Sequence, residues 1–440
     1  MVKKVAIVGA GPSGVLLAHY LLRRGDKYQI DIYDRRNDPR LVEFSKYRTF
    51  SIALNNRGMS ALQKIEGLEK AVKAITVETT GSITHQKNGK MRRMQRKTPF
   101  FTADRTNLAI ALLNALTKKY DNSRLNIHFN SKCIQVDLAT KKLKFQKLDE
   151  ALTPINEGDL TVDYDLLIGA DGVHSVVRES LLTLDFFECD QKSYRNDYKT
   201  IFLPNPNEKP GLNLEPGKIH SWRSDGNTAI LLVYQLDGTI SGVIYFPRGK
   251  NQIVGLSSSE EVLQFFQDNF PEIGQLMPKE EAEAFLARPV SSVLTIRCNR
   301  YHYSDSVLLI GDAAHAVSPS LGQGCNAALE DVAVFDKLLD QYSDDIALAL
   351  EQFTINRKED AHALAELSEN AFPSSSKLFI EFLIRESFAK SMHQLFPKYF
   401  SPSMMDLIFS STVPYSEILN SYKGWMSKLK KSNEKFLANL

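Results

Sequence analysis

The first 34 residues contain a pattern that few folds accommodate. A β-branched apolar run, Val5 to Val8, leads into a Gly-x-Gly-x-x-Gly turn at residues 9–14, and apolar residues then recur at helical spacing from Val15 to Arg24. Gln29 to Tyr33 is strand-like again. Strand, glycine-rich turn, helix and strand in this order predict a βαβ unit, whose parallel strands imply a doubly wound, Rossmann-like α/β sheet.

The same turn predicts what this sheet binds. Its glycines allow a tight turn and the close approach of backbone to a pyrophosphate at the positive end of the following helix. Asp34 stands at the end of the second strand, where a carboxylate accepts a hydrogen bond from a ribose hydroxyl. A chance glycine-rich turn is the alternative, but the strand, the helix and the acid are all in register. We therefore expect a dinucleotide site.

A second motif follows an apolar strand at residues 165–169. Asp171-Gly172 ends that strand, and Ser175 and Arg178 lie on the next helical turn. Alone, this pattern is equally well explained as a capped junction between strand and helix.

A third motif begins with Gly311-Asp312, after a buried strand at residues 307–310, and continues through Pro319 to the loop Gly322-Gln-Gly-Cys-Asn326. A carboxylate just past a strand can hold the sugar-like chain of a cofactor. The helix that begins near Asn326 directs its partial positive charge at a flat ring lying against the loop.

These three motifs, in this order and at these separations, resemble the flavoprotein monooxygenases of the p-hydroxybenzoate hydroxylase type. The resemblance implies non-covalently bound FAD, NAD(P)H as co-substrate, and hydroxylation of a small aromatic substrate by O2 through a flavin C4a-hydroperoxide. It also implies the cofactor-binding residues Gly9, Gly11, Pro12, Ser13, Gly14, Asp34, Arg35, Arg36, Ala53, Arg105, Ile134, Asp171, Gly311, Asp312, Gly324, Cys325 and Asn326.

Within this family the sequence is most similar to the kynurenine 3-monooxygenases, through the stretches at 51–58, 104–108, 265–271 and 311–316. That group clamps the substrate carboxylate with an arginine and a tyrosine, where this sequence has Ser82 and Pro99. Ala371 and Ser375 replace an asparagine and a methionine, whereas Tyr415 matches a retained tyrosine. Because a bidentate carboxylate contact has no neutral equivalent, we expect a substrate other than kynurenine.

The remaining candidates for the site are few. His85, Phe372 and Tyr415 are candidate substrate-binding residues, and Arg48 and Tyr415 are candidate catalytic residues in a reaction that the flavin itself carries out. The basic run at residues 90–97 supplies a replacement cation or is a solvated turn. His315 is interpreted as a hydrogen-bonding residue rather than a catalytic one.

Changes in the pattern of apolar and turn-forming residues along the chain suggest three parts. We expect an FAD-binding domain at residues 1–75, 100–182 and 296–345, with strand-like runs at 127–136 and 165–169 and a helix at 105–119. An inserted antiparallel β-sheet substrate domain is expected at 76–99 and 183–295, with a hairpin turning at Asp237-Gly238 and a helix capped by Ser257 and Ser258. Residues 346–440 form a C-terminal helical region.

The charge balance and the cysteine content limit the classes of partner and cofactor that we expect. The 440 residues carry 54 Lys and Arg against 52 Asp and Glu, so no overall field favours a nucleic acid. The four cysteines form no CxxC pair, which argues against a structural metal and fits a reducing cytoplasm. We expect no transmembrane anchor, and a monomer or homodimer. The basic C-terminal helix is interpreted as packed on its own domain rather than lying on a membrane.

Two alternatives keep the cofactor and change the activity. One is an oxygen-independent flavin reductase or a halogenase on the same scaffold, although Trp222 and Trp425 are too far apart for a Trp-x-Trp motif. The other is a non-catalytic FAD-binding protein, which the altered substrate positions suggest.

Overall fold

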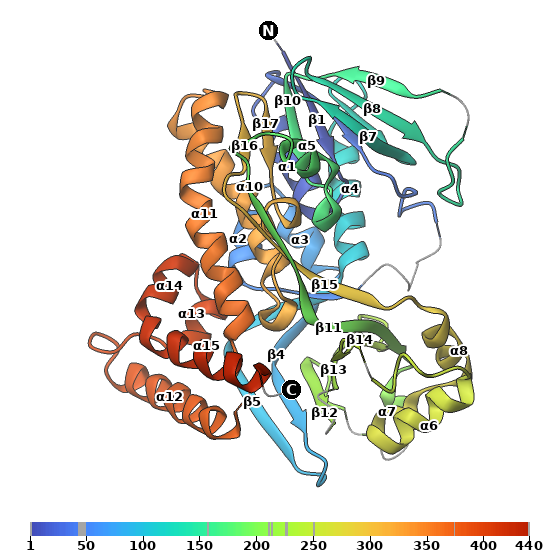
Figure 1. The fold of residues 1–440 in the computed structure, drawn as a ribbon, viewed down its shortest axis with the longest axis vertical. Helices are drawn as coiled ribbons and strands as arrows, with labels where there is room; N and C mark the ends of the chain where they lie inside the picture. Colours follow the sequence, from blue (N-terminus) through green and yellow to red (C-terminus); the bar gives the residue numbers. More distant parts are fainter. Residues whose placement is uncertain are drawn as a thin grey trace.

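The structure is a computed structural model that describes residues 2–42, 50–155, 158–209, 212, 214–224, 228–249, 251–373 and 375–438. Its N-terminal unit is β1 (Lys3–Val8), α1 (Pro12–Leu22) and β2 (Tyr28–Tyr33). These strands lie in a six-stranded sheet of order β16-β17-β10-β1-β2-β6, shown in Figure 1. Its other members are β6 (Leu125–His128), β10 (Leu166–Gly169), β16 (His302–Tyr303) and β17 (Val307–Leu309), and only β16 pairs antiparallel. The doubly wound α/β prediction is confirmed.

Helices pack around this sheet. Helix α1 contacts both α4 (Arg105–Lys119) and α10 (Gly324–Gln341), and α10 also contacts α2 (Asn56–Gln63) and α11 (Ile346–Asn370). The short α3 (Leu68–Lys73) packs on α2 and α4. Their apolar faces form one large core with the buried strands, and this core fixes the carboxyl ends of β1, β2, β10 and β17.

A small third sheet was not foreseen. It consists of β7 (Ser131–Asp137), β8 (Lys142–Lys147) and β9 (Leu160–Asp163), and α5 (Val176–Leu181) packs on β7 (Figure 1). The expectation of a single strand-like run at 127–136 is wrong, because Asn130 has a φ of 54° and turns the chain between β6 and β7. The two halves of that run therefore pair in different sheets.

The substrate sheet has eight strands in the order β15-β11-β14-β13-β12-β4-β5-β3. In chain order these are β3 (Ser51–Leu54), β4 (Val77–His85), β5 (Met91–Asp104), β11 (Cys189–Leu203), β12 (Lys218–Arg223), β13 (Ala229–Tyr234), β14 (Ile240–Pro247) and β15 (Ser291–Cys298). All pairs are antiparallel except β12 with β4. The hairpin of β13 and β14 confirms the turn predicted at Asp237-Gly238.

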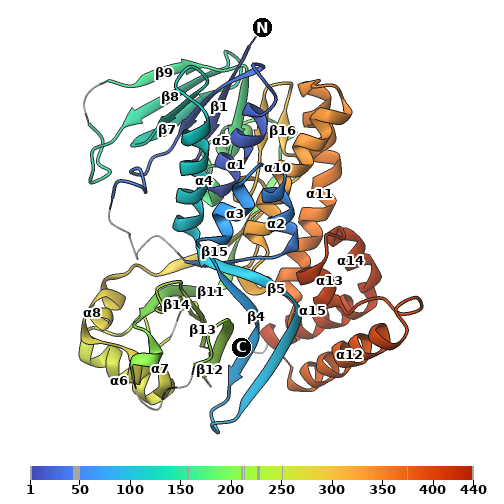
Figure 2. The same ribbon diagram turned by 180° about the vertical axis from the view of Figure 1, so that it is seen from behind.

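Helices α6 (Ser259–Asn269), α7 (Pro271–Leu276) and α8 (Lys279–Ala287) lie beside this sheet, as Figure 2 shows from behind. The Ser258 side chain accepts a hydrogen bond from the Glu261 N–H, and the Glu261 carboxylate reaches back to Ser257. The predicted cap is therefore present. Strand β3 and the end of β5 pair in this sheet, although the expected division places residues 51–54 and 100–104 in the cofactor domain. The three-part division stays a prediction.

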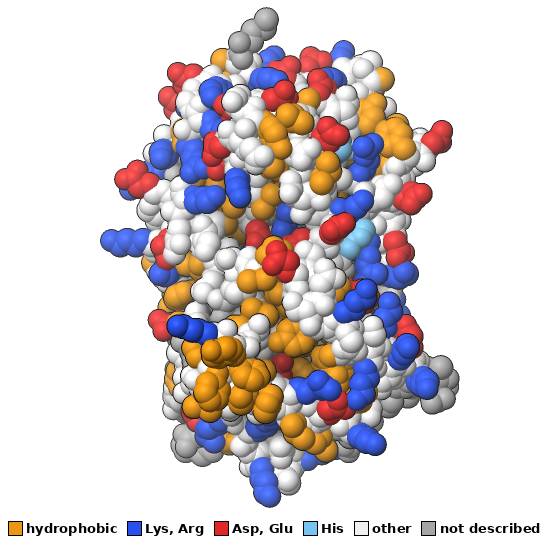
Figure 3. Space-filling model, turned by 90° about the vertical axis from the view of Figure 1, so that its left-hand side faces the viewer, with side chains coloured by type: hydrophobic (Ala, Val, Ile, Leu, Met, Phe, Trp, Pro, Cys, Tyr) orange, Lys and Arg blue, Asp and Glu red, His pale blue; other side chains and the backbone are white. Residues whose placement is uncertain are grey.

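The C-terminal region consists of α12 (Ser376–Leu395), α13 (Met404–Ser410), α14 (Tyr415–Ser421) and α15 (Lys423–Ala438). Helix α14 packs on α11, and the region has its own apolar core. Figure 3 views the molecule from the left-hand side of Figure 1 and shows exposed apolar side chains gathered in its lower part. The exposed apolar residues of α12 and of the turn after it are Ile380, Ile384, Phe388, Leu395, Phe396 and Tyr399. Within the described residues, no helix has the length and hydropathy required to cross a bilayer.

Candidate active site

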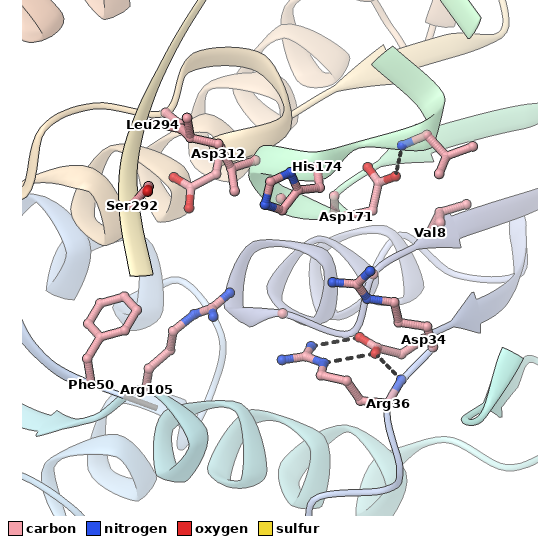
Figure 4. Close-up of a pocket in the computed structure, with 18 of the residues that line it drawn as sticks. Val8, Asp34, Arg36, Phe50, Arg105, Asp171, His174, Ser292, Leu294 and Asp312 are labelled. Carbon is pink, nitrogen blue, oxygen red and sulfur yellow. Dashed lines mark hydrogen bonds and ion pairs between the residues drawn. The ribbon is translucent and has the colours of Figure 1, made fainter. Parts of the chain in front are cut away.

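A cavity of about 360 Å³ opens at the carboxyl ends of the central strands. Its walls come from the cofactor sheet, from α4 and from strands β11, β14 and β15 of the substrate sheet. Figure 4 shows that the labelled residues run from Asp34 and Arg36 at one end, past Asp171 and His174, to Phe50 and Arg105 at the other. The carboxyl edge of a doubly wound sheet is where such folds bind their ligands.

At one end of the cavity the Asp34 carboxylate is fixed by Arg36. The Arg36 Nε and Nη2 donate to its two oxygens over 2.9 and 2.7 Å, and the Ala10 N–H donates to Oδ2 over 2.8 Å. Burial by itself would raise the pKa of Asp34, but these hydrogen bonds and the Arg36 charge hold it below its ordinary value. Asp34 therefore stays ionised and able to accept further hydrogen bonds.

The glycine turn forms the floor beside Asp34. Gly9 has a φ of 111°, and a Cβ there would come within 2.3 Å of the Ala170 carbonyl oxygen. A Cβ on Gly14 would meet the Gly9 carbonyl at 2.2 Å, so both positions need glycine for the fold. A Cβ on Gly11 would meet nothing closer than the Arg105 guanidinium at 3.9 Å. The space above Gly11, at the start of α1, is therefore open to a ligand.

Midway along the cavity, Asp171 has one satisfied and one unsatisfied oxygen. Its Oδ2 accepts from the Val176 N–H over 2.7 Å, which caps the turn leading into α5. Its Oδ1 is buried and has no hydrogen-bond partner among the described residues. Burial outweighs the hydrogen bonds from Ser175 and the backbone and raises the pKa of Asp171. A hydroxyl donor in the cavity would satisfy this oxygen.

The Gly311-Asp312 turn is held from beneath by a buried ionic cluster. Asp331 Oδ2 accepts from the Gly311 N–H over 2.8 Å and from His315 Nε2 over 2.6 Å, while its Oδ1 accepts from Arg357 over 2.9 Å. His315 is therefore a hydrogen-bonded member of this cluster, which agrees with its interpretation from the sequence. Asp312 itself lines the cavity, at the edge where Gly324 begins α10.

A second network fixes the start of α10. Asn326 accepts a hydrogen bond from the Asn55 N–H and donates to the Ala53 carbonyl, over 2.9 and 2.8 Å. Gln323 Oε1 accepts from the Asn55 side chain and from the Tyr415 hydroxyl. The first N–H groups of α10 are consequently held toward the loop at 316–322, part of which lines the cavity.

Residues from the substrate sheet close the other end of the cavity. Tyr198 and Tyr245 face each other across β11 and β14, with ring centroids 6.0 Å apart. Burial raises the pKa of both hydroxyls, so both remain protonated. The same wall contains Phe50, Val243, Leu294, Val317 and Pro319. Sequence reasoning missed these two tyrosines. The available signal was that side chains alternate between the two faces of a strand, here β11 and β14.

The structure places the predicted cofactor residues in three groups. Those lining the cavity are Gly9, Gly11, Asp34, Arg35, Arg36, Arg105, Asp171 and Asp312. A supporting layer holds the turns and the start of α10, and comprises Pro12, Ser13, Gly14, Ala53, Gly311, Gly324, Cys325 and Asn326. Ile134 instead lies at a bulge of β7 with its side chain 37% exposed, while its neighbour Cys133 lines the cavity.

The substrate and catalytic candidates that the structure describes do not line the cavity. His85 is at the far end of β4, beside the hairpin, and bonds His220 over 2.9 Å. Phe372 is 44% exposed and packs edge-on against Phe382. Tyr415 is fully buried under the Arg57 guanidinium, 4.0 Å from its ring centroid. Arg48 lies outside the described residues. The direction of β4 and the packing of the C-terminal helices determine where these residues lie. Matching short stretches of sequence to a family does not include that information.

A family model described as an FAD binding domain matches residues 3–209 and 270–368. The chain belongs to this FAD-binding family. It is 31% identical to a kynurenine 3-monooxygenase from Drosophila willistoni, over 97% of this chain and 91% of the relative. It is 30% identical to a violacein synthase from Chromobacterium violaceum, over 94% and 96%. The resemblance seen in the sequence is confirmed, and the protein is an FAD-dependent monooxygenase that uses NAD(P)H.

Solved structures agree with the fold. The tetrameric form of 2-methyl-3-hydroxypyridine-5-carboxylic acid oxygenase superposes with a TM-score of 0.68 at 20% identity, over 84% of this chain and 90% of the other. The residues of the cavity also fit FAD. Asp34 at the end of β2 offers a carboxylate of the kind that accepts from a ribose hydroxyl, and the space over Gly11 at a helix start is open. Asp171, which also lines the cavity, has an oxygen without a partner among the described residues.

Proposed function

We propose that this monooxygenase hydroxylates a small aromatic molecule held against the tyrosine wall, which we define as Tyr198, Tyr245, Phe50, Leu294 and Val317. The observation that carries the proposal is that this wall and the predicted cofactor residues line one continuous cavity, in which Figure 4 places Phe50 and Leu294 away from Asp34. Aromatic rings pack well against tyrosine and phenylalanine faces, and few polar groups are then needed to set orientation.

The protein's part in the reaction is binding, orientation and electrostatics. Bound FAD supplies the redox chemistry, which is acceptance of two electrons from NAD(P)H and activation of O2. We assign Asp34 to the adenosine ribose, Gly11 and Arg105 to the pyrophosphate, and Asp171 and Asp312 to the polyol chain and its neighbours. The N–H groups that begin α10 stabilise negative charge developing on the flat ring.

The tyrosine wall orients the substrate and excludes water. Because their pKa values are raised, the hydroxyls of Tyr198 and Tyr245 are hydrogen-bond donors throughout the physiological range. A substrate oxygen or ring nitrogen facing the wall would accept from one of them. No protein nucleophile is required.

We infer that kynurenine is not the preferred substrate. One relative is named for kynurenine and another for violacein synthesis at nearly equal identity, so overall similarity does not decide the substrate. The sequence resemblance matches Ser82 and Pro99 to the two positions at which the kynurenine enzymes have the carboxylate clamp. A neutral or differently anchored aromatic ring fits this sequence better.

We also propose that the protein works as a monomer or homodimer in the cytoplasm. All four cysteines are free thiols, which is typical of a reducing compartment. Size-exclusion chromatography with light scattering tests the oligomer, and a larger assembly would contradict it.

The decisive experiment measures NADPH and NADH oxidation together with O2 uptake by the FAD-loaded protein. The panel contains indoles, phenols, aromatic acids, tryptophan and kynurenine. We expect one class other than kynurenine to stimulate both rates and to yield a product heavier by one oxygen atom. Tyr198→Phe should weaken that stimulation, whereas Tyr399→Phe, at an 84% exposed position, is the control. A rate unchanged by every aromatic compound would contradict the proposal.

A further inference from the structure

Two cysteines face each other where the substrate sheet joins the cofactor sheet. Cys189 and Cys298 are direct register partners at the ends of the antiparallel strands β11 and β15. Their side chains are hydrogen-bonded to each other. Both are free thiols in this structure.

The backbone around this pair is suited to a covalent link. The adjacent Asn299 N–H donates to the Glu188 carbonyl over 2.9 Å, so the cysteines occupy the non-hydrogen-bonded position of the ladder. Facing Cα atoms at such positions lie about 4.5 Å apart. Disulfides span Cα separations of roughly 4.4–6.8 Å. The two sulfurs can therefore join without a shift of the strands.

The two thiols differ in accessibility and in acidity. Cys298 is fully buried, whereas Cys189 is partly exposed. The hydrogen bond from Cys298 lowers the pKa of Cys189, and the Arg178 guanidinium acts in the same direction. That same hydrogen bond, together with burial, raises the pKa of Cys298. Because Cys189 is the accessible member and its pKa is lowered, we assign it as the reactive thiol and Cys298 as the thiol held beside it.

The other two cysteines offer an internal comparison. Burial raises the pKa of both Cys133 and Cys325 to about 12, so neither is a thiolate near neutral pH. Neither has a second cysteine as its hydrogen-bond partner. Reactivity should therefore be confined to the pair at the strand ends.

We propose that Cys189 and Cys298 form a peroxide-oxidisable dithiol that closes into a reversible cross-strand disulfide. The Cys189 sulfur attacks hydrogen peroxide, an S–O bond forms, the O–O bond breaks, and water leaves. The Cys298 sulfur then attacks the Cys189 sulfur, the S–O bond breaks, and a second water leaves with the Cys298 proton. Two thiols lose two electrons in total, and one peroxide becomes two waters.

The cysteine pair lies next to residues that contact the cofactor motifs, so a disulfide there can affect the cofactor site. Arg178, beside the pair, donates to the carbonyls of Val173 and Ala313 over 2.7 and 3.0 Å, and so joins the second and third cofactor motifs. Strand β15 also contributes Ser292 and Leu294 to the cavity. A monooxygenase that oxidises NAD(P)H without a substrate reduces O2 to peroxide, so the oxidant would arise within the same molecule. This internal source of peroxide rests on the proposed function, whereas the chemistry of the cysteine pair does not.

The test treats the FAD-loaded full chain with added hydrogen peroxide at neutral pH. The protein is then unfolded in denaturant so that every remaining free thiol can be alkylated. We expect an intact mass lower by two hydrogens before alkylation, two alkylated thiols at Cys133 and Cys325, and one peptide linking Cys189 to Cys298. Dithiothreitol should restore all four thiols. Because peroxide is added, this result does not depend on the substrate or on turnover.

Variants separate the roles of the two residues. Cys189→Ser should abolish the bridge, Cys133→Ser should leave it unchanged, and Cys298→Ser should leave Cys189 as a sulfenic acid that dimedone labels. At pH 7, alkylation of Cys189 should be at least about tenfold faster than that of Cys133. A bridge to Cys133 or Cys325, over-oxidation of wild-type Cys189 without a bridge, or four unreacted thiols would each overturn the proposal.

Discussion

Tyr415 donates its hydroxyl hydrogen to Gln323 Oε1 over 3.0 Å, although the two residues lie 92 positions apart. The same oxygen accepts from the Asn55 side chain over 2.8 Å. Gln323 immediately precedes α10, whose first residue, Gly324, lies beside the cavity-lining Asp312. The C-terminal helices thus contact the residue that precedes α10, and Tyr415 does not line the cavity. We propose a positioning role for Tyr415.

Tyr415→Phe should test this role. The ring would keep its packing under Arg57, but buried Gln323 would lose a donor, at a cost of about 1–2 kcal/mol in the free energy of unfolding. We expect FAD affinity to fall several-fold, measured by flavin fluorescence. Tyr399→Phe at the exposed turn is the matched control and should change neither quantity. Unchanged FAD affinity in Tyr415→Phe would refute the positioning role.

Gly11→Ala should separate folding from cofactor binding. The new methyl would meet only the Arg105 side chain at 3.9 Å, so the fold is retained, while the methyl occupies the proposed pyrophosphate space. We expect a melting temperature of the FAD-free protein within a few degrees of wild type and FAD affinity at least about tenfold weaker. Gly424→Ala, which meets nothing within 4 Å, should preserve both. Equal FAD affinity in the two variants would contradict the cofactor assignment.

Asp331→Asn should be among the most destabilising single changes. Asp331 is fully buried, and its charge balances Arg357 beside His315. Breaking a buried pair by removing one partner typically costs about 3–5 kcal/mol, and urea unfolding measures the loss. Asp305→Asn removes a carboxylate that is 58% exposed and pairs with Lys141 on the surface, and should cost less than about 1 kcal/mol. Similar losses of unfolding free energy in the two variants would show that the buried Asp331 cluster stabilises the protein no more than a surface ion pair does.

Stability should fall as the pH drops from about 6.5 toward 4. Burial lowers the pKa of His19 and of His302 to about 4, whereas an unfolded histidine titrates near 6.5. Between these values the unfolded chain binds protons that the native chain does not, which favours unfolding by about 1.4 kcal/mol per pH unit for each histidine. Above pH 6.5 the histidines are neutral in both states, so this loss of stability is absent there.

Urea unfolding at pH 5 and pH 7.5 measures that slope. His19→Gln should flatten it by about one histidine's share, whatever its effect on stability at pH 7.5. Tyr399→Phe, at the exposed turn after α12, is the control variant and should keep the wild-type slope. An identical slope in wild type and His19→Gln would show that His19 does not contribute.

Local patterns in the sequence were enough to predict the βαβ unit, the β13–β14 hairpin, the cap at Ser258 and the third motif's helix start. Each depends on residues within about 35 positions of one another, and periodicity and turn chemistry act at that range. The family resemblance then extended the local assignment to a whole cofactor. The small sheet of β7 to β9 escaped because one left-handed residue, Asn130, divides an otherwise uniform apolar run.

Only the tertiary structure decided which distant side chains share the cavity. Tyr198 and Tyr245 meet because β11 and β14 are paired in one register, and a shift of one residue would turn each away. His85 and Phe372 lie elsewhere because strand direction and helix packing, rather than motif spacing, place them. The sequence by itself determined the fold class and the cofactor chemistry, since these depend on short-range backbone requirements. Long-range packing determined the substrate wall, the Tyr415–Gln323 contact and the facing cysteines.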